Sequence, residues 1–203
     1  MGKETEILYL DEESLEAVVE KTGYALENWG ICIIPTDTIY GIVALDRFKE
    51  SVNEIYQIKE RPPSKPFIRL IGNLDNLKAY TNQSLPETLR KYWPGPLTVI
   101  FRGIHNDKIS IRFPADEFLQ RLFKRVNYGV IVAPSANPSG EADIFESDQL
   151  IEIFYGRVDV IVCKKESLKK KKPSTIIDIS EHKWRVIREG ALTLDDTVLG
   201  RIS

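Results

Sequence analysis

A short apolar run that stops abruptly at a proline constrains this chain more than any other feature. Ile31–Ile34 is rich in β-branched residues and is bounded by a glycine and by Pro35. A bounded run of this length is typical of a strand that is buried on both faces. The polar sequence Thr36-Asp37-Thr38 follows at once. The segment therefore predicts a buried strand that opens into a hydroxyl-rich turn.

A helix is predicted directly after this strand and turn. From Phe48 onward, apolar residues recur at helical spacing until Pro62-Pro63. Proline lacks the backbone N–H and restricts the residue before it, so the helix should end there. Its last turn carries two cations, Lys59 and Arg61. We expect these two side chains to reach the same region as the polar turn.

The same arrangement of an apolar segment beside a polar turn recurs twice further along the chain. Val130–Ala133 leads into Pro134–Asn137, and Pro173–Thr175 borders another β-like segment. Strand ends in α/β sheets are common places for ligands. Arginines lie at expected element ends beside Pro or Gly residues, namely Arg61, Arg112 and Arg188.

Short polar donors together with fixed cations suit an oxyanion such as a phosphate or a carboxylate. Each feature also has an ordinary structural interpretation, because Ser, Thr, Asn and Pro are common turn formers. In sequence, an Arg112 that binds a ligand cannot be told from an arginine on a solvent-facing strand. In the same way, a Lys59 that binds a ligand cannot be told from a lysine at a solvated helix end. Spacing alone therefore predicts an α/β domain with an anion site.

The remaining periodicities predict further strands and helices without strict alternation. A helix from Leu15 to Trp29 should end at Gly30. Strands mixed with helices in this way predict an α/β (α+β) fold, with a three-layer mixed sheet rather than a Rossmann fold. Further strands are expected at residues 7–10, 67–71, 97–101, 109–113, 158–163, 174–179 and 184–188, and helices at 74–80, 86–93, 116–127, 147–154 and from 194.

Composition excludes several classes of function. The formal net charge is −2, which argues against a strongly basic coat for nucleic acid. Cys32 and Cys163 both lie in apolar runs and are expected to be buried hydrophobic side chains rather than a disulfide or a metal pair. No run approaches the roughly 18 apolar residues that a membrane span needs, so no membrane partner and a cytoplasmic location are expected.

Read together, the polar turns resemble the YrdC-like family, the threonylcarbamoyl-AMP synthases. Seven short motifs carry the resemblance, and all occur in one order along the chain. They are PTDTIYG at 35–41, IKERPPSKP at 58–66, WPGPLTVIF at 93–101, ISIRFP at 109–114, APSANPSG at 133–140, PSTIID at 173–178 and IREGAL at 187–192.

The resemblance implies a fold and a reaction. The implied fold is a twisted mixed β-sheet whose flanking helices enclose a concave, positively charged cavity. The implied reaction is a nucleotidyl transfer that joins L-threonine, bicarbonate or CO2, and ATP into threonylcarbamoyl-AMP and releases pyrophosphate. The product serves the tRNA modification N6-threonylcarbamoyladenosine, with later transfer by partner proteins. Because the chain ends shortly after the last motif, we expect a single domain over residues 1–203 in the short form of the family.

The resemblance also assigns roles to individual residues. Lys59 and Arg61 are expected to neutralise the carbamate and the phosphates. Mg²⁺ is expected to arrive with ATP and to take no ligand from the protein. The expected ATP contacts are Arg61, Lys65, Ser135, Asn137 and Arg188, and the expected threonine contacts are Thr38, Tyr40, Arg112, Ala133 and Ser174.

Two other functions stay open at this point. The domain could hold tRNA or double-stranded RNA without catalysis, and the lysine-rich segment Lys164–Lys172 could face that RNA or be a solvated loop. It could also be a divergent paralogue that acts on another amine. Many family members carry a histidine near the position of Leu70 and another after the Arg112 strand, where this chain has Asp116-Glu117.

Overall fold

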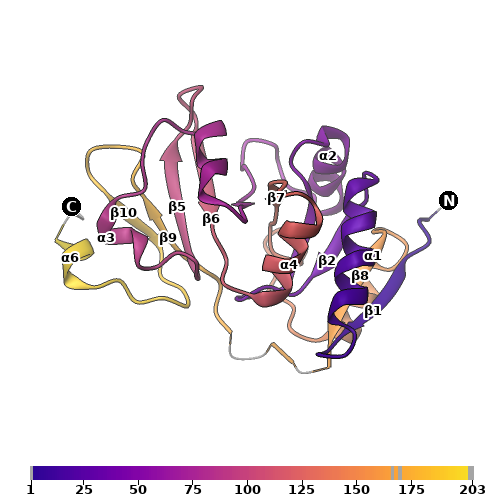
Figure 1. The fold of residues 1–203 in the computed structure, drawn as a ribbon. Coiled ribbons are helices and arrows are strands. Elements are labelled where there is room, and N and C mark those ends of the chain that lie inside the picture. The colour runs from indigo at the N-terminus through magenta and orange to yellow at the C-terminus, as the bar shows by residue number, and fades with distance from the viewer. Residues whose placement is uncertain (1, 166, 169–170, 201–203) are drawn as a thin grey trace.

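The computed structural model describes residues 2–165, 167–168 and 171–200. Figure 1 shows the arrangement of its helices and strands. The strands are β1 Glu6–Leu10, β2 Cys32–Ile34, β3 Gly41–Leu45, β4 Arg69–Leu70, β5 Leu97–Arg102, β6 Lys108–Arg112, β7 Ile131–Val132, β8 Val160–Lys164, β9 Thr175–Asp178 and β10 Arg185–Arg188. The helices are α1 Leu15–Glu27, α2 Lys49–Ile58, η1 Leu74–Ala79 (a 3₁₀ helix), α3 Glu87–Arg90, α4 Glu117–Arg125, α5 Ser147–Phe154 and α6 Asp196–Leu199.

The described strands form one mixed sheet in the order β1-β8-β2-β3-β7-β4-β6-β5-β9-β10. Parallel pairs, such as β2 with β8, stand beside antiparallel pairs, such as β2 with β3. The mixed sheet predicted from the sequence is confirmed. The strand pairing is short at the centre of the sheet, where β7 and β4 pair through only two residues each.

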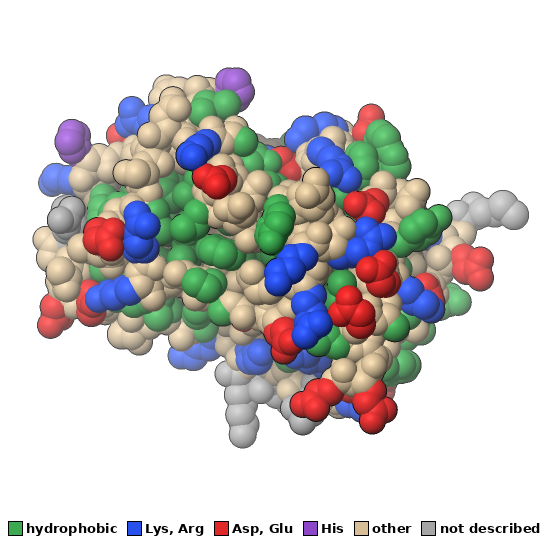
Figure 2. All heavy atoms as spheres, viewed as in Figure 1, with side chains coloured by type: hydrophobic (Ala, Val, Ile, Leu, Met, Phe, Trp, Pro, Cys, Tyr) green, Lys and Arg blue, Asp and Glu red, His purple; other side chains and the backbone are tan. Residues whose placement is uncertain are grey.

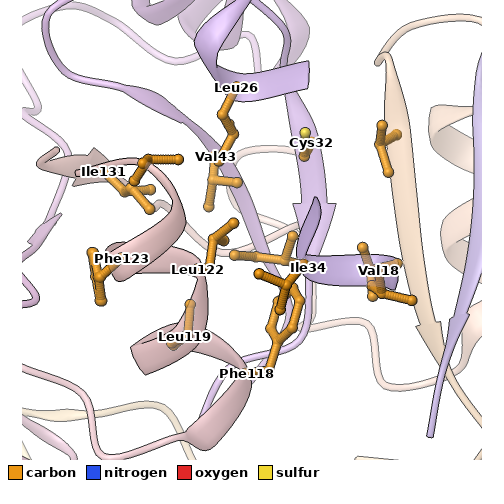
Figure 3. Close-up of a cluster of buried hydrophobic side chains, with 14 of the residues drawn as sticks. Val18, Leu26, Cys32, Ile34, Val43, Phe118, Leu119, Leu122, Phe123 and Ile131 are labelled. Carbon is orange, nitrogen blue, oxygen red and sulfur yellow. The ribbon is translucent and has the colours of Figure 1, made fainter. Parts of the chain in front are cut away.

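The run Ile31–Ile34 explains why one half of the sheet has helices on both faces. Successive side chains of a strand point to opposite faces. Cys32 and Ile34 pack with α1 and α4, whereas Ile31 and Ile33 pack with α2 and α5. Figure 3 shows side chains of α1 and α4 meeting those of β2 and β3 on the first of these faces. An uninterrupted apolar strand is therefore what this three-layer half requires.

Helices α1 and α4 lie side by side on this face (Figure 1). Gly23 of α1 permits the close approach, because a Cβ there would lie 2.4 Å from Cγ of Arg125. Arg125 forms ion pairs with Glu20 at 2.7 Å and with Glu27 at 2.6 Å. Figure 2 accordingly shows acidic and basic side chains interspersed over these helices.

Two expectations from the sequence need correction. No strand was assigned to Gly41–Leu45, yet this segment is β3 and all five residues are buried. Its apolar character did not lead to a strand prediction because the segment follows the polar turn without a break. The end of α1 also differs, since the C-cap is Asn28 and Trp29 adopts the left-handed conformation with φ of 66°. Gly30 follows it and donates its N–H to the Ala25 carbonyl at 2.8 Å.

One further expectation is confirmed. Cys32 and Cys163 are free and buried among apolar side chains. Within the part of the chain that the structure describes, no helix is long and apolar enough to cross a membrane.

Candidate anion-binding site

A cleft of about 220 Å³ lies where the three polar turns meet. The turn after β2, the turn after β7 and the turn before β9 all contribute to its wall. Three arginines and one carboxylate, Asp143, are the charged side chains among its described lining residues. The polar and charged lining residues are Thr36, Thr38, Tyr40, Arg61, Ser110, Arg112, Ser135, Asp143, Ser174 and Arg188.

Sheet register explains how two arginines that are distant in sequence reach one cleft. Thr98 of β5 is paired with Arg112 on one side and with Ile176 on the other. Ile176 is in turn paired with Arg188 of β10. Residues in one row across a sheet point to the same face. Arg112 and Arg188 therefore project from one row that spans four strands.

A bulge is needed to bring Arg188 into this row. The pairing of β10 with β9 shifts between Val186 and Arg188, so Ile187 is the extra residue. A bulge of this kind redirects the side chains that follow it. Without it, Arg188 would pair one residue further along β9 and point to the other face. Simple strand alternation could not have shown this.

Arg112 is a buried cation with unused hydrogen-bonding capacity. Its residue is 5% exposed, and its Nη1 donates to Thr38 Oγ1 at 2.9 Å. Nη2 lies 3.2 Å from Asp37 Oδ1, but this ion pair lacks hydrogen-bond geometry, and Nε has no hydrogen-bond partner among the described residues. Burial lowers the pKa of Arg112, while Asp37 and Asp116 oppose that shift. An arginine stays protonated in proteins, so a buried N–H is left for a ligand.

Arg188 is held against the turn that precedes β9. Its Nε donates to the Ser174 carbonyl at 2.9 Å, and Nη2 donates to Ser174 Oγ at 3.1 Å. Ser174 Oγ also lies 2.8 Å from Thr98 Oγ1. Burial lowers the pKa of Arg188, Asp143 opposes the shift, and the charge of Arg112 adds to it. Two like charges within each other's field would be stabilised by an anion between them.

The turns after β2 and β7 are locked together by backbone hydrogen bonds. Gly41 and Ser135 form an antiparallel bridge. The Ile42 N–H donates to the Pro134 carbonyl at 3.0 Å, and the Ala136 N–H donates to the Tyr40 carbonyl at 2.9 Å. Within the first of these turns, the hydroxyl of Thr36 accepts from the Thr38 N–H at 3.1 Å. The polar groups of the cleft are therefore held in place before any ligand arrives.

Tyr40 forms part of the cleft wall and is almost completely buried. Its hydroxyl oxygen accepts from the Lys164 N–H at 3.0 Å and lies 3.3 Å from Ser147 Oγ. Burial raises the pKa of Tyr40, and these two hydrogen bonds oppose the shift. The side chain is thus anchored away from the cleft at its polar end. Ala133 also lines the cleft.

Arg61 belongs to the segment that follows α2. Its Nε donates to the Lys65 carbonyl at 2.9 Å, and its guanidinium carbon lies 5.5 Å from the centre of the Phe67 ring. These contacts keep the guanidinium at the edge of the cleft. The Lys65 side chain is exposed and is not among the lining residues.

Lys59 and Asn137 lie behind the cleft wall rather than in it. Lys59 is 2% exposed and donates to the backbone carbonyls of Ser135, at 2.5 Å, and of Asn137. The side-chain amide of Asn137 donates to the Glu141 carbonyl at 2.7 Å, while its Oδ1 accepts no hydrogen bond within the described part of the chain. The structure thus gathers eight of the predicted site residues around the cleft: Thr38, Tyr40, Arg61, Arg112, Ala133, Ser135, Ser174 and Arg188.

Sequence reasoning missed both carboxylates at the site. Asp37 lies inside a motif that was recognised, and its position next to Thr38, a predicted contact residue, could have drawn attention to it. Asp143 lies in the irregular segment before α5 and shows no signal in the sequence. It is nevertheless close enough to raise the pKa values of both Lys59 and Arg188 against the effect of burial.

Comparisons with known proteins identify the family of this chain. The model of the Sua5/YciO/YrdC family, described as telomere recombination, matches residues 24–190. The chain belongs to this family. Family membership confirms the resemblance that the seven motifs carried. A solved structure of Pyrococcus abyssi Sua5 complexed with L-threonine superposes with a TM-score of 0.84 at 27% identity, over 98% of this chain and 61% of that chain.

Two sequence relatives carry the name of one activity. A threonylcarbamoyl-AMP synthase of P. abyssi is 31% identical over 185 residues, which cover 83% of this chain and 53% of that protein. A protein of Methanocaldococcus jannaschii, provisionally named for the same activity, is 30% identical over 202 residues, which cover 95% of each chain. The present chain thus spans about half the length of the P. abyssi relative.

Proposed function

We propose that this chain forms threonylcarbamoyl-AMP from L-threonine, bicarbonate or CO2, and ATP, and releases pyrophosphate. The observation that carries the proposal is the convergence of Arg61, Arg112 and Arg188, from three distant segments, on one cleft. The names of the relatives support the choice of reaction. The complex of P. abyssi Sua5 with L-threonine supports the amino acid.

The reaction needs gathering and alignment of anions more than it needs a nucleophile from the protein. The amine nitrogen of threonine forms a bond to CO2 and loses a proton, which gives a carbamate. A carbamate oxygen then forms a bond to the α-phosphorus of ATP. The bond from that phosphorus to the bridging oxygen breaks, and pyrophosphate leaves with the electron pair. Fixed cations lower the repulsion between the reactants and align them.

The geometry suggests a division of the cleft between two reactants. The unpartnered Nε of Arg112, together with the Thr38 hydroxyl, would bind the threonine carboxylate. Arg188 and Ser135 would contact the nucleotide, and Arg61 at the edge would meet the phosphates. Mg²⁺ would enter as part of the ATP substrate and offset the charge of the triphosphate. The class of the reaction would then be adenylyl transfer.

The direct test is incubation of the protein with ATP, Mg²⁺, bicarbonate and L-threonine. We expect pyrophosphate and the adenylate to appear together, and both to require threonine. Arg188→Ala should weaken ATP binding by about 10- to 150-fold, because a charged hydrogen bond is worth about 1.5–3 kcal/mol. Arg185→Ala, an exposed position on the same strand, is the matched control. Pyrophosphate release that does not require threonine would refute the proposal. Equal effects of Arg188→Ala and Arg185→Ala on ATP binding would also refute it.

Serine and other amines should replace threonine poorly in this assay. If another amine supported faster adenylate formation than threonine, the chain would be a divergent paralogue with another substrate. Titration of each amino acid in the presence of ATP would measure the preference directly.

The proposed product would be consumed by threonylcarbamoyl-transfer proteins that modify tRNA, in the cytoplasm. Direct contact with tRNA stays a prediction, and so does the role of Lys164–Lys172. Residues 166, 169 and 170 of that segment lie outside the described residues. If this segment binds RNA, the affinity for tRNA should fall steeply with salt. Absent or salt-independent binding would exclude such a contact.

A further inference from the structure

Lys59 is a buried cation whose described partners are backbone carbonyls rather than carboxylates. Its ammonium donates to the Ser135 carbonyl at 2.5 Å and to the Asn137 carbonyl. The residue is 2% exposed and lies outside the lining of the cleft. A cation that bound the phosphates of a ligand would need a free face toward them. Lys59 instead directs its charge into the protein, toward the turn that carries Ser135.

The end of α2 explains why Lys59 and Arg61 have different partners. Glu60 lies between them in the left-handed conformation, with φ of 51°. The Arg61 N–H donates to the Tyr56 carbonyl at 3.0 Å, and the Glu60 N–H donates to the Gln57 carbonyl at 3.1 Å. This is the hydrogen-bond pattern of a Schellman motif. The reversal at Glu60 leaves Lys59 behind the turn and takes Arg61 to the cleft.

The turn at 135–137 is therefore held from two sides. On one side, the Ala136 N–H donates to the Tyr40 carbonyl at 2.9 Å. On the other side, Lys59 binds two carbonyls of the turn, and its own carbonyl accepts from the Ser139 N–H at 3.2 Å. Hydrogen bonds from a charged donor are about twice as strong as neutral ones. The side chain of Lys59 thus connects the end of α2 to the part of the wall that presents Ser135.

We infer that Lys59 is a positioning residue, whose ammonium holds the 135–137 turn in the conformation that presents Ser135 to the cleft. Arg61 is then the only member of the Lys-x-Arg pair that meets the ligand. The inference differs from the role that the resemblance assigned to Lys59. It also holds whichever anion the cleft binds. Burial and the charge of Arg61 lower the pKa of Lys59 to about 8, and Asp143 opposes them, so the ammonium is still mainly protonated at pH 7.

The first test labels lysines of the wild-type protein with an amine-reactive reagent, with and without ATP and Mg²⁺, and locates the products by mass spectrometry. We expect Lys59 to resist labelling in both states and the exposed Lys65 to be labelled. An accessible lysine with a lowered pKa would react faster than Lys65, so resistance reports enclosure. Labelling of Lys59 that is lost when ATP binds would overturn the inference, because it would show direct contact with the nucleotide.

The second test compares Lys59→Met with Lys65→Met by amide hydrogen exchange. The peptide that covers residues 136–139 should exchange at least about 10-fold faster in Lys59→Met, and the rest of the sheet should keep its protection. Lys65→Met should leave this peptide unchanged. Unchanged exchange in Lys59→Met would contradict a positioning role. If Lys59→Met fails to fold, the labelling of the wild-type protein decides alone.

A third measurement separates positioning from contact by ionic strength. Loss of a charge that meets the phosphates should make the Kd for ATP less sensitive to salt, as we expect for Arg61→Ala. Lys59→Met should weaken binding while keeping the salt dependence of the wild type. A flattened dependence in Lys59→Met would contradict the inference. Two of these measurements, hydrogen exchange and lysine labelling in the absence of nucleotide, do not require the proposed reaction. A failure of the proposed function would therefore be distinguished from a failure of the inference about Lys59.

Discussion

Replacement of Arg112 by Met should destabilise the protein strongly, although the position faces a cleft. The substitution leaves Asp37, whose side chain is 14% exposed, without its cation. At the observed 3.2 Å, the attraction between the two charges is about 5 kcal/mol at an effective dielectric constant of 20. Removal of one partner from a buried pair typically costs about 3–5 kcal/mol. The hydrogen bond to Thr38 is lost as well.

Urea denaturation of four proteins measures this effect: the wild type, Arg112→Met, Asp37→Asn and the double variant. We expect Arg112→Met to lose about 3–5 kcal/mol of unfolding free energy at an unchanged m-value. The double variant should be less destabilised than the sum of the single ones by about 2–3 kcal/mol. A loss below about 1 kcal/mol, or additive effects, would refute the claim that Arg112 and Asp37 form a stabilising buried ion pair.

Four further expectations concern other parts of the fold. Leu122→Ala should cost about 2–5 kcal/mol in urea denaturation, because the side chain is fully buried between α4 and the sheet (Figure 3). Glu60→Gly should stabilise the protein by about 0.5–1 kcal/mol, since its φ is positive. Deletion of Ile187 should reduce ATP affinity as much as Arg188→Ala while circular dichroism stays the same. The folded pKa of Lys59 is lowered to about 8 from 10.5, so between these values the unfolded chain binds more protons. The unfolding free energy of the wild type relative to Lys59→Met should therefore rise from pH 8 to pH 10.5, and a flat difference would contradict the lowered pKa.

Local sequence patterns were sufficient wherever one physical requirement dominated. The run Ile31–Ile34 is apolar throughout because helices cover both of its faces, so its pattern alone predicted a buried strand. Segment Gly41–Leu45 has the same character, yet it was missed because it continues a turn without a break. At the end of α1, glycine was expected at the helix terminus, but Trp29 adopts the left-handed conformation and stacks on Phe48 at 4.4 Å. Such tertiary contacts are not visible in a local pattern.

The site was predicted as a set of residue types but not as an arrangement. Motif resemblance led to Arg112 and Arg188, but the bulge that aligns them depends on strand pairing. The motif resemblance predicted that Lys59 meets a ligand. In sequence, a lysine at a helix end looks the same whether it faces a ligand or the protein interior. Asp143 could not be found, since nothing in its neighbours distinguishes it from a loop residue. Side-chain direction is set by tertiary structure, which the sequence shows only indirectly.

The cleft draws on residues from Thr36 to Arg188, so segments that are distant in sequence must come together before its walls exist. Occupancy is consequently linked to the folding of the whole domain: a ligand at 100 times its Kd would add about 2.7 kcal/mol to global stability. Depletion of the ligand would then leave a less stable form of the protein.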